Sequence, residues 1–295
     1  MKLNLRQKGN QRSAGVPPTV LITGCSSGFG KHLVDAFLDN GWRVIATMRR
    51  AEERASLFKN ASDRYGDRLI IANLDVTSDA DRSAVTTLVS ELDGSNGLNC
   101  LVNNAGYALF GALETCSDAQ LREQFEVNLL APTLLTKQLL PALRAARGSV
   151  INVSSIMSFM GFPLSSAYCS SKAGLTMLSE ALSLELTPFG VRVHAVEPGG
   201  FRTGFVDNSQ WGNVEVADYQ AVTEGFHQFQ DRLNQGPGNN PQPVINRIVE
   251  LAMAQDSRLT HQVGRDAWMS KLMHKTVPES VRIKLMGMMF KRVLQ

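Results

Sequence analysis

Two residues that can exchange a proton, Tyr168 and Lys172, lie four positions apart in the chain. On a helix this spacing brings both side chains to one face, about one turn apart. A phenol has a pKa of about 10, too high for ready proton transfer at neutral pH, and a nearby ammonium group favours the phenolate and lowers that pKa. We therefore expect Tyr168 and Lys172 to act as one acid/base unit. The alternative is a solvated helix face, where this spacing is common.

A short stretch rich in glycine lies near the amino-terminal end of the sequence. It contains three glycines and two serines: Gly24, Ser26, Ser27, Gly28 and Gly30. The residues before it, Thr19–Thr23, have the pattern of a strand, and Lys31–Asn40 has the apolar spacing of a helix. In a dinucleotide-binding turn, such glycines permit the turn and the approach of backbone to pyrophosphate, and the helix start attracts phosphate. The stretch predicts such a site, with the serine hydroxyls as further donors. The alternative is a turn that needs glycine only for its geometry.

The end of the second predicted strand, Trp42–Met48, indicates which dinucleotide binds. An acidic residue at this point binds the ribose hydroxyls of NAD, whereas an arginine accommodates the 2′-phosphate of NADP. Here Arg49 and Arg50 follow the strand, and the first acidic residue is Glu52. Arg49 is placed to form a forked contact with a phosphate. The predicted cofactor is therefore NADP(H), with NAD(H) as the alternative if both arginines are ordinary solvated charges.

The elements that must position these residues alternate along the chain. Further strands are predicted at Arg68–Asn73, Leu98–Val102, Ser149–Val153, Val191–Val196 and His261–Gly264. Further helices are predicted at Ser78–Leu92, Asp118–Arg147, Ala167–Leu186 and Val244–Ala254. Pro132 and Pro141 should bend or interrupt the helix that contains them. The alternation predicts an α/β fold, a single Rossmann-type doubly wound parallel sheet of about seven strands with helices on both faces.

The periodic pattern is lost after Pro198. Residues 199–240 are rich in glycine, asparagine, glutamine and aromatic residues, and 236–240 form a cluster of helix breakers. We expect this segment to be an irregular lid over the substrate. Its aromatic side chains either line an apolar pocket or pin the lid to the body: Phe201, Phe205, Trp211, Tyr219 and Phe226.

The two ends of the chain differ in character. Residues 1–18 are polar and basic, and we expect a flexible tail followed by one domain over residues 19–295. Residues 279–294 are rich in methionine, basic and amphipathic, which predicts a helix. This helix could dock on the body of the protein, on a partner subunit or on a membrane surface.

Composition excludes several classes of protein. The 295-residue chain has 43% hydrophobic and 19% charged residues, which is ordinary for a globular protein. Its net charge of +3 comes partly from the basic tail, so no nucleic-acid partner is indicated. The cysteines and histidines are scattered, and we expect neither a disulfide framework nor a metal site. No apolar run approaches about 18 residues, so we expect no transmembrane segment and a cytoplasmic location.

Five further motifs fall in order where the predicted topology places them: Leu74–Thr77, Asn103–Gly106, Asn128, Asn152–Ser155 and Pro198–Thr203. With the glycine turn and with Tyr168, thirteen residues after Ser155, they resemble the short-chain dehydrogenase/reductase family over residues 19–203. Residues 47–50 and 196–203 are similar to the branch that contains 17β-hydroxysteroid and retinol dehydrogenases.

The resemblance implies an active site of Asn128, Ser155, Tyr168 and Lys172. Tyr168 would donate a proton to the carbonyl oxygen in reduction, or remove it from the alcohol in oxidation, and Ser155 would hydrogen-bond that oxygen. Lys172 would lower the pKa of Tyr168 and hold the nicotinamide ribose, while Asn128 would support a water linked to Lys172. The oxidised nicotinamide would add a second positive charge, so the pair would be fully tuned only with cofactor bound. Ser154 is a neighbouring candidate, but the thirteen-residue offset favours Ser155.

The resemblance also implies a set of cofactor contacts. They are Gly24, Ser26, Ser27, Gly28, Phe29, Gly30, Arg49, Asp75, Val76, Asn103, Ala105, Gly106, Tyr168, Lys172, Pro198, Gly199 and Thr203. Asp75 would lie at the adenine ring, and Pro198 and Thr203 at the nicotinamide end. Two positions depart from the family pattern. Phe29 replaces an aliphatic residue, and Glu197 replaces a more typical polar or small residue, which fits the hydroxysteroid-like branch.

The expected activity is NADP(H)-dependent interconversion of a carbonyl and a secondary or primary alcohol on a bulky apolar substrate. The resemblance further implies a homodimer or homotetramer that associates through the helices near 118–145 and 167–186. The alternatives are an NAD-dependent alcohol dehydrogenase of the same fold and a non-catalytic NADP-binding sensor or scaffold.

Overall fold

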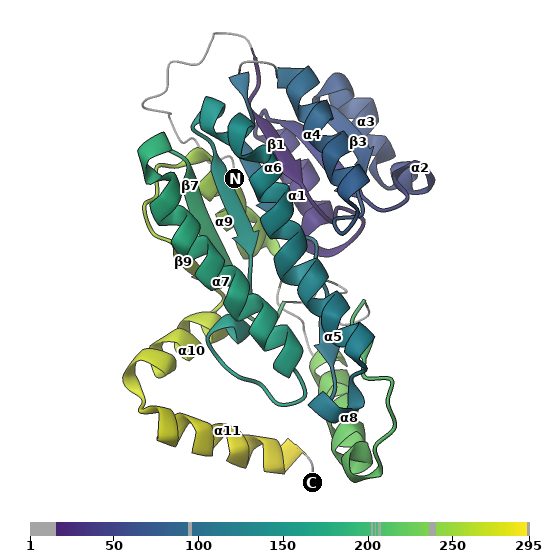
Figure 1. The fold of residues 1–295 in the computed structure, drawn as a ribbon, viewed down its shortest axis with the longest axis vertical. Coiled ribbons are helices and arrows are strands. Elements are labelled where there is room, and N and C mark those ends of the chain that lie inside the picture. The colour runs from purple at the N-terminus through teal and green to yellow at the C-terminus, as the bar shows by residue number, and fades with distance from the viewer. Residues whose placement is uncertain are drawn as a thin grey trace.

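A seven-stranded parallel sheet forms the centre of the computed structural model, which describes residues 16–93, 96–201, 203, 205, 208–235 and 240–293 (Figure 1). The strands are β1 (Thr19–Ile22), β2 (Arg43–Met48), β3 (Leu69–Asn73), β4 (Cys100–Asn103), β6 (Ser149–Val153), β7 (Arg192–Pro198) and β9 (Thr260–Val263). Their order is β3-β2-β1-β4-β6-β7-β9, and every neighbouring pair is parallel. The order reverses between β1 and β4, the point at which doubly wound sheets bind ligands.

Helices cover both faces of this sheet, which confirms the predicted fold class. On one face, α1 (Gly28–Asp39) packs against α9 (Gln242–Met253), and both contribute to a core with Val20, Val44 and Val102. On the other face, the core is built from α4 (Asp79–Asp93), α6 (Ala131–Ala146) and α7 (Ser166–Leu186). The strands are buried between these layers, as expected for a parallel sheet.

The predicted long helix over 118–147 is divided by its middle turn. It consists of α5 (Asp118–Phe125), a π-helical turn at Glu126–Leu130, and α6. Ser117 caps α5 in a capping box with Gln120. Pro132 lies in the first turn of α6, where proline is tolerated, and α6 continues through Pro141.

The segment expected to be irregular contains a helix, so that prediction was wrong in part. Helix α8 (Gln220–Gln235) places Val222, Phe226 and Phe229 at helical spacing, and these side chains pack in one apolar cluster. Residues 208–219 are mostly irregular and include β8 (Gln210–Trp211), which pairs in parallel with β5 (Leu109–Phe110). The breaker cluster at 236–239 and the tail at 1–15 lie outside the described residues.

Four further α-helices complete the described part of the chain. Helices α2 (Ala51–Arg54) and α3 (Lys59–Tyr65) lie between β2 and β3, and α10 (Arg265–Thr276) follows β9; none of these three was predicted. The last helix, α11, spans Glu279–Val293, close to the range predicted for it. In Figure 1, α10 and α11 form an arm beside the sheet at the end of the molecule where α8 lies. None of the described helices has both the length and the apolar character needed to cross a bilayer.

Candidate active site

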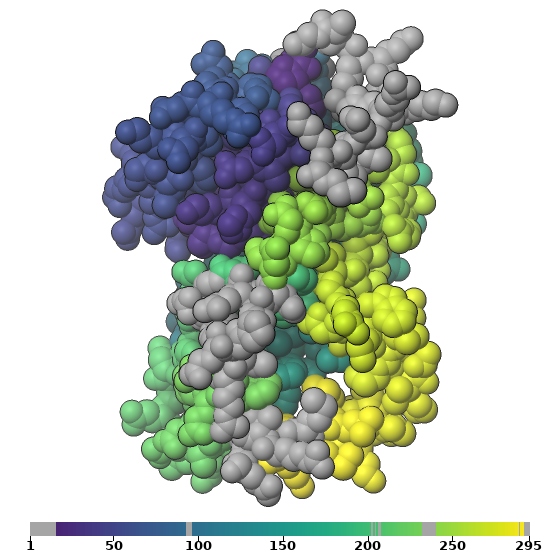
Figure 2. Space-filling view, turned by 180° about the vertical axis from the view of Figure 1, so that it is seen from behind, coloured from purple at the N-terminus to yellow at the C-terminus, as the bar shows by residue number. Residues whose placement is uncertain are grey.

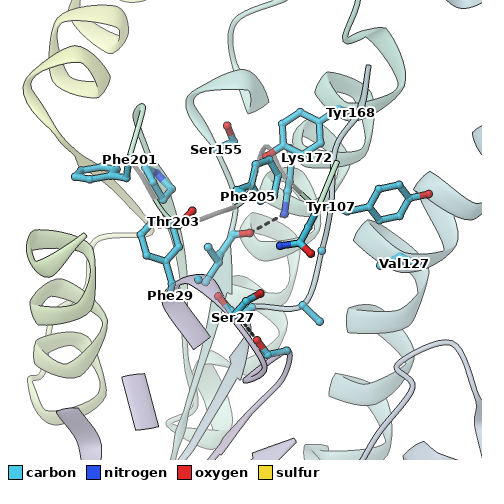
Figure 3. A pocket seen from close by; sticks show the side chains of 18 of the residues that line it. Ser27, Phe29, Tyr107, Val127, Ser155, Tyr168, Lys172, Phe201, Thr203 and Phe205 are labelled. Carbon is cyan, nitrogen blue, oxygen red and sulfur yellow. Dashed lines mark hydrogen bonds between the residues drawn. The ribbon is translucent and has the colours of Figure 1, made fainter. Parts of the chain in front are cut away.

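A cavity of about 670 Å³ opens at the carboxyl ends of the central strands, and most of the predicted site residues line it. From the cofactor prediction these are Gly24, Ser26, Ser27, Gly28, Phe29, Arg49, Asp75, Val76, Ala105, Gly106, Tyr168, Lys172, Pro198, Gly199 and Thr203. Figure 3 shows Ser155, Tyr168 and Lys172 together, with Phe29 and Phe201 to one side and Tyr107 and Val127 to the other. The cavity thus joins residues from segments far apart in the sequence.

The glycine turn is shaped to let a ligand approach the backbone. Gly24 has a φ of +72°, and a Cβ placed on it would lie 2.9 Å from the Cα of Ala105. A Cβ on Gly30 would overlap the carbonyl oxygen of Gly24. Asn104 holds the turn, because its side-chain amide donates to the carbonyl oxygens of Thr23 at 2.8 Å and Gly24 at 3.2 Å. These contacts, with the start of α1 at Gly28, fit a dinucleotide pyrophosphate.

Two of the predicted cofactor contacts, Gly30 and Asn103, do not line the cavity, and their contact with cofactor stays a prediction. Gly30 does not line the cavity; it allows α1 to pack closely on the turn. Asn103 is buried behind the cavity and donates to Thr136 Oγ1 at 3.0 Å and to Asn152 Oδ1 at 2.8 Å. These bonds tie β4 to β6 and α6, so Asn103 supports the site without facing it.

Helix α7 brings Tyr168 and Lys172 into the cavity wall, and both side chains are almost fully buried. The Lys172 Nζ lies 5.9 Å from the centre of the Tyr168 ring and donates to the carbonyl oxygen of Val153 at 2.8 Å. Burial raises the pKa of Tyr168, and a hydrogen bond with Ser155 lowers it by a smaller amount. The spacing of the two residues predicts that Lys172 lowers this pKa; in the structure the largest influence is burial, which raises it. Burial also lowers the pKa of Lys172 to about 8, so both groups hold their protons at neutral pH.

The structure distinguishes Ser155 from Ser154. Ser154 is buried, with its hydroxyl bonded to the carbonyl oxygen of Lys172 and to Thr176 Oγ1. Ser155 caps a short helical turn at Ile156–Ser158, where its Oγ accepts from the amide of Met157 at 3.1 Å. Its additional bond to Tyr168 supports Ser155 as the serine that shares the reacting oxygen.

Asn128 lies in the π-helical turn and is buried beneath the cavity. Its amide donates to the carbonyl oxygen of Tyr107 at 2.9 Å and to Ser171 Oγ at 3.3 Å, while its Oδ1 accepts from the amide of Tyr107 at 3.2 Å. A Cβ on Gly106 would lie 3.0 Å from Asn128 Oδ1 and 3.5 Å from Lys172 Nζ. Asn128 and Lys172 therefore approach the same glycine, but the predicted water link between them stays a prediction.

The end of the cavity away from the glycine turn is apolar. Of the five aromatic residues proposed for it, Phe205 and Phe226 line this end, whereas Phe201 lines the cavity beside Phe29, with 6.1 Å between the ring centres. Trp211 and Tyr219 pack behind Phe205 and Phe226, with the Trp211 ring 6.0 Å from that of Phe226. Both of the proposed roles, lining and pinning, are therefore present.

Several lining residues were not predicted: Arg54, Asn104, Tyr107, Phe110, Phe229 and Asp266. Arg54 ends the short helix α2 and lines the same end of the cavity as Arg49. A second cation soon after the second strand is the sequence signal that could have indicated Arg54. Asp266, in the first turn of α10, accepts from the amide of Gly200 at 2.6 Å. That contact joins segments 66 residues apart, and no local pattern indicates it.

Glu197, one of the two departures from the family pattern, is fully buried at the end of β7. Its carboxylate accepts hydrogen bonds from Ser158 at 2.9 Å and from Gln262 at 2.5 Å. It also pairs with Lys271 of α10 at 3.4 Å. Glu197 therefore connects the loop after Ser155 to the last strand and to α10.

Comparisons with known proteins agree with this geometry. A family model described as "short chain dehydrogenase" matches residues 18–212. The chain is 33% identical to retinol dehydrogenase 8 from Homo sapiens, covering 85% of this chain and 83% of that protein. It is 32% identical to 11-beta-hydroxysteroid dehydrogenase type 2 from Oryctolagus cuniculus, covering 95% and 72%. A crystal structure of a short-chain dehydrogenase from Streptomyces avermitilis has 33% identity and a TM-score of 0.77, covering 91% of this chain and 96% of that one.

The chain therefore belongs to the short-chain dehydrogenase family, as the sequence motifs indicated. It is an oxidoreductase of this family, and its relatives are consistent with a hydroxysteroid- and retinol-dehydrogenase-like branch.

Proposed function

We propose that the protein is an NADP(H)-dependent oxidoreductase that interconverts a carbonyl and a secondary or primary alcohol on a bulky apolar substrate. The observation that carries this proposal is the shared cavity. A tyrosine, a lysine and a serine with hydrogen-bonding side chains lie between a glycine turn and an apolar end. A polar reacting group and an apolar body can therefore be held at once.

The chain's own residues account for the proton in this reaction. Tyr168, whose pKa is raised by burial, holds the proton that it donates to a carbonyl oxygen in the reductive direction. Ser155 hydrogen-bonds the same oxygen as negative charge develops on it. The ammonium of Lys172 lies nearby and stabilises the phenolate that remains. A bound nicotinamide would supply or accept the hydride.

The cofactor preference rests on the end of β2. Arg49 follows β2 directly and lines the cavity together with Arg54. Two guanidinium groups at this end favour a 2′-phosphate over a free ribose hydroxyl. Asp75 and Val76 lie at the same end and would border the adenine ring. The alternative is NAD(H), and the two are separated by comparing kcat/KM for NADPH and NADH.

The substrate class rests on the aromatic end of the cavity. Phe110, Phe205, Phe226 and Phe229 line it and belong to one apolar cluster. These side chains suit a steroid, retinoid or lipid-derived ketone better than a small polar one. The names of the relatives, a retinol and a hydroxysteroid dehydrogenase, point to the same class.

The decisive test is Tyr168→Phe assayed with NADPH against a panel of ketones and aldehydes of increasing apolar size. The wild-type protein should turn over the bulky members, and the variant should lose at least ~10³-fold in kcat because the proton donor is gone. NADPH affinity, measured by fluorescence titration, should change little. Full activity in Tyr168→Phe would exclude the proposed mechanism, and NADPH binding without turnover of any carbonyl would favour a sensor or scaffold.

A further inference from the structure

The outer surface of helices α10 and α11 is apolar and exposed. We call it the arm surface and define it by the side chains Trp268, Met269, Leu272, Val281, Leu285 and Met288. Trp268 and Met269 are 62% and 61% exposed, and large apolar side chains that gather on one exposed surface mark an interaction site. On α11 the three members have the spacing i, i+4 and i+7, which places them on one face. Nothing in this surface serves the cavity.

The helices that carry the arm surface are also basic. Residues 265–293 contain seven lysine and arginine residues and two acidic residues, a net charge of +5, whereas the whole chain carries +3. One of the two acids, Asp266, is turned inward to the amide of Gly200. The exposed cations Arg265, Lys275, Lys284 and Lys291 remain at the surface. Apolar side chains flanked by cations are the pattern of a segment that lies in a membrane interface.

We propose that the arm surface docks the protein on an anionic lipid bilayer. The positive charge around the arm surface decides between the two possible partners, a second copy of this chain and a bilayer. A second copy that presented the same surface would bring one excess of positive charge against another, which is unfavourable. An anionic bilayer supplies the opposite charge to the lysines and an apolar layer for the methionine and leucine side chains. Tryptophan, here Trp268, is enriched at the depth of the lipid headgroups.

The position of the arm supports this partner. Helix α11 packs against α8, and its Phe290 contacts the aromatic cluster that contains Phe226. In the back view of Figure 2, the yellow arm and the green residues around α8 lie at the same end of the molecule. Docking would thus bring the apolar end of the cavity close to the bilayer. The delivery of an apolar substrate by this route rests on the proposed function, whereas docking itself does not.

The test is cosedimentation of the full-length protein with vesicles of phosphatidylcholine alone, or with about one third phosphatidylserine, at low and high salt. We expect binding only to the vesicles that contain phosphatidylserine, weakened by salt because the attraction is partly electrostatic. Lys284→Glu with Lys291→Glu should lower the partition coefficient at least ~5-fold, since each cation contributes to the attraction. Trp268→Ser with Met269→Ser should lower it similarly by removing apolar anchors.

Matched controls lie at the far end of the molecule. Lys59→Glu with Leu57→Ser makes the same kinds of change at exposed positions near α3 and should leave vesicle binding unchanged. Thermal melts followed by circular dichroism show whether each variant is folded, and the charge and apolar variants test the surface independently. Equal binding to both vesicle types, no binding, or equal loss in the control would overturn the proposal. Arm variants that change the oligomeric mass while vesicles bind nothing would assign the surface to a second copy and also overturn it.

Discussion

At the scale of single residues, burial is the main influence on the acid/base pair. Tyr168 and Lys172 are packed in the wall of the cavity, where burial raises the pKa of the phenol and lowers that of the ammonium. Spacing alone suggested that the ammonium would dominate. A phenol that firmly keeps its proton suits the reductive direction, because it begins the reaction as the donor.

The pKa of Lys172 predicts a pH dependence for carbonyl reduction. With a pKa of about 8, Lys172 is charged below that pH and becomes neutral above it. Loss of the charge removes stabilisation from the Tyr168 phenolate, so kcat/KM should be level below pH 8 and fall above it. The measurement is a profile of kcat/KM against pH with saturating NADPH. A profile that stays level to about pH 10 would show that the charge on Lys172 is not required.

The proposed cofactor preference is also a matter of single residues. Arg49→Ala should lower kcat/KM for NADPH by roughly 10- to 100-fold, because a charge-assisted contact with phosphate is lost. The same change should leave NADH kinetics within about 2-fold, since NADH has no 2′-phosphate. Steady-state kinetics with both cofactors measures this. Equal effects on both would contradict a phosphate contact at Arg49.

The sequence could not indicate the cavity residues that tertiary packing brings in from distant segments. The Tyr168–Lys172 spacing, the glycine turn and Arg49 each carry a local pattern with a physical meaning. Asn104 was noticed only as part of a motif, and its role in holding the glycine turn depends on a contact across 80 residues. Asp266 has no pattern of its own and is brought in by the packing of α10.

At the scale of elements, the π-helical turn at Glu126–Leu130 and the helix α10 are the informative additions. A π-helical turn often marks a functional position in a helix, and this one carries Asn128. Helix α10 contributes Asp266 to the Gly199–Gly200 turn and Lys271 to Glu197. It therefore holds the end of β7 from two sides. In α10 only Ala267 is buried, while the large apolar side chains Trp268 and Met269 are exposed, so the helix lacks the core-facing stripe by which periodicity would have predicted it.

The buried pair of Glu197 and Lys271 should couple α10 to the loop after Ser155. Glu197→Gln removes the charge, and Lys271→Met leaves the carboxylate buried without its cation, so each should destabilise the fold by about 1–3 kcal/mol. In a double-mutant cycle the coupling energy should be about 1 kcal/mol or more. Urea unfolding measures the cycle, and kcat should also fall in each single variant. Glu250→Gln is the control, because the Glu250 side chain is 47% exposed in its pair with Arg247, and it should cost under about 0.5 kcal/mol. Additive effects would show that the pair does not couple these elements.

At the scale of the whole molecule, the strand and helix alternation was enough to predict the sheet and the two helical layers. The order of the strands, the helix α8 and the packing of α11 against α8 depend on contacts that no local period records. Gly225 inside α8 weakened its helical pattern, and tertiary packing of Phe226 and Phe229 overrides that weakness.

A homo-oligomer remains a proposal, and the exposed apolar side chains on the predicted interface support it. Leu130, Leu134, Met177 and Leu184 lie on or beside α6 and α7, and Leu184 is 73% exposed. We expect a mass of two or four times 32.2 kDa in light scattering. Leu184→Glu should shift this mass toward the monomer, because it places a charge in the interface. Leu57→Glu, on a remote exposed turn, should leave the mass unchanged. A monomeric wild-type protein would contradict the proposal.

The small parallel ladder between β5 and β8 has a consequence for how the cavity can open. The amide of Gln210 donates to the carbonyl oxygen of Ala108, and the amide of Gly212 donates to that of Phe110, both at 2.8 Å. The amide of Val214 donates to the carbonyl oxygen of Thr115 at 2.9 Å. The segment between β7 and α8 is thus fastened at its middle to the strand after the Asn103–Gly106 motif. An opening of the cavity that keeps these bonds must rotate the segment about residues 210–214, which stay fixed. Amide hydrogen exchange should then be slow at Gln210, Gly212 and Val214, whose amides make these bonds.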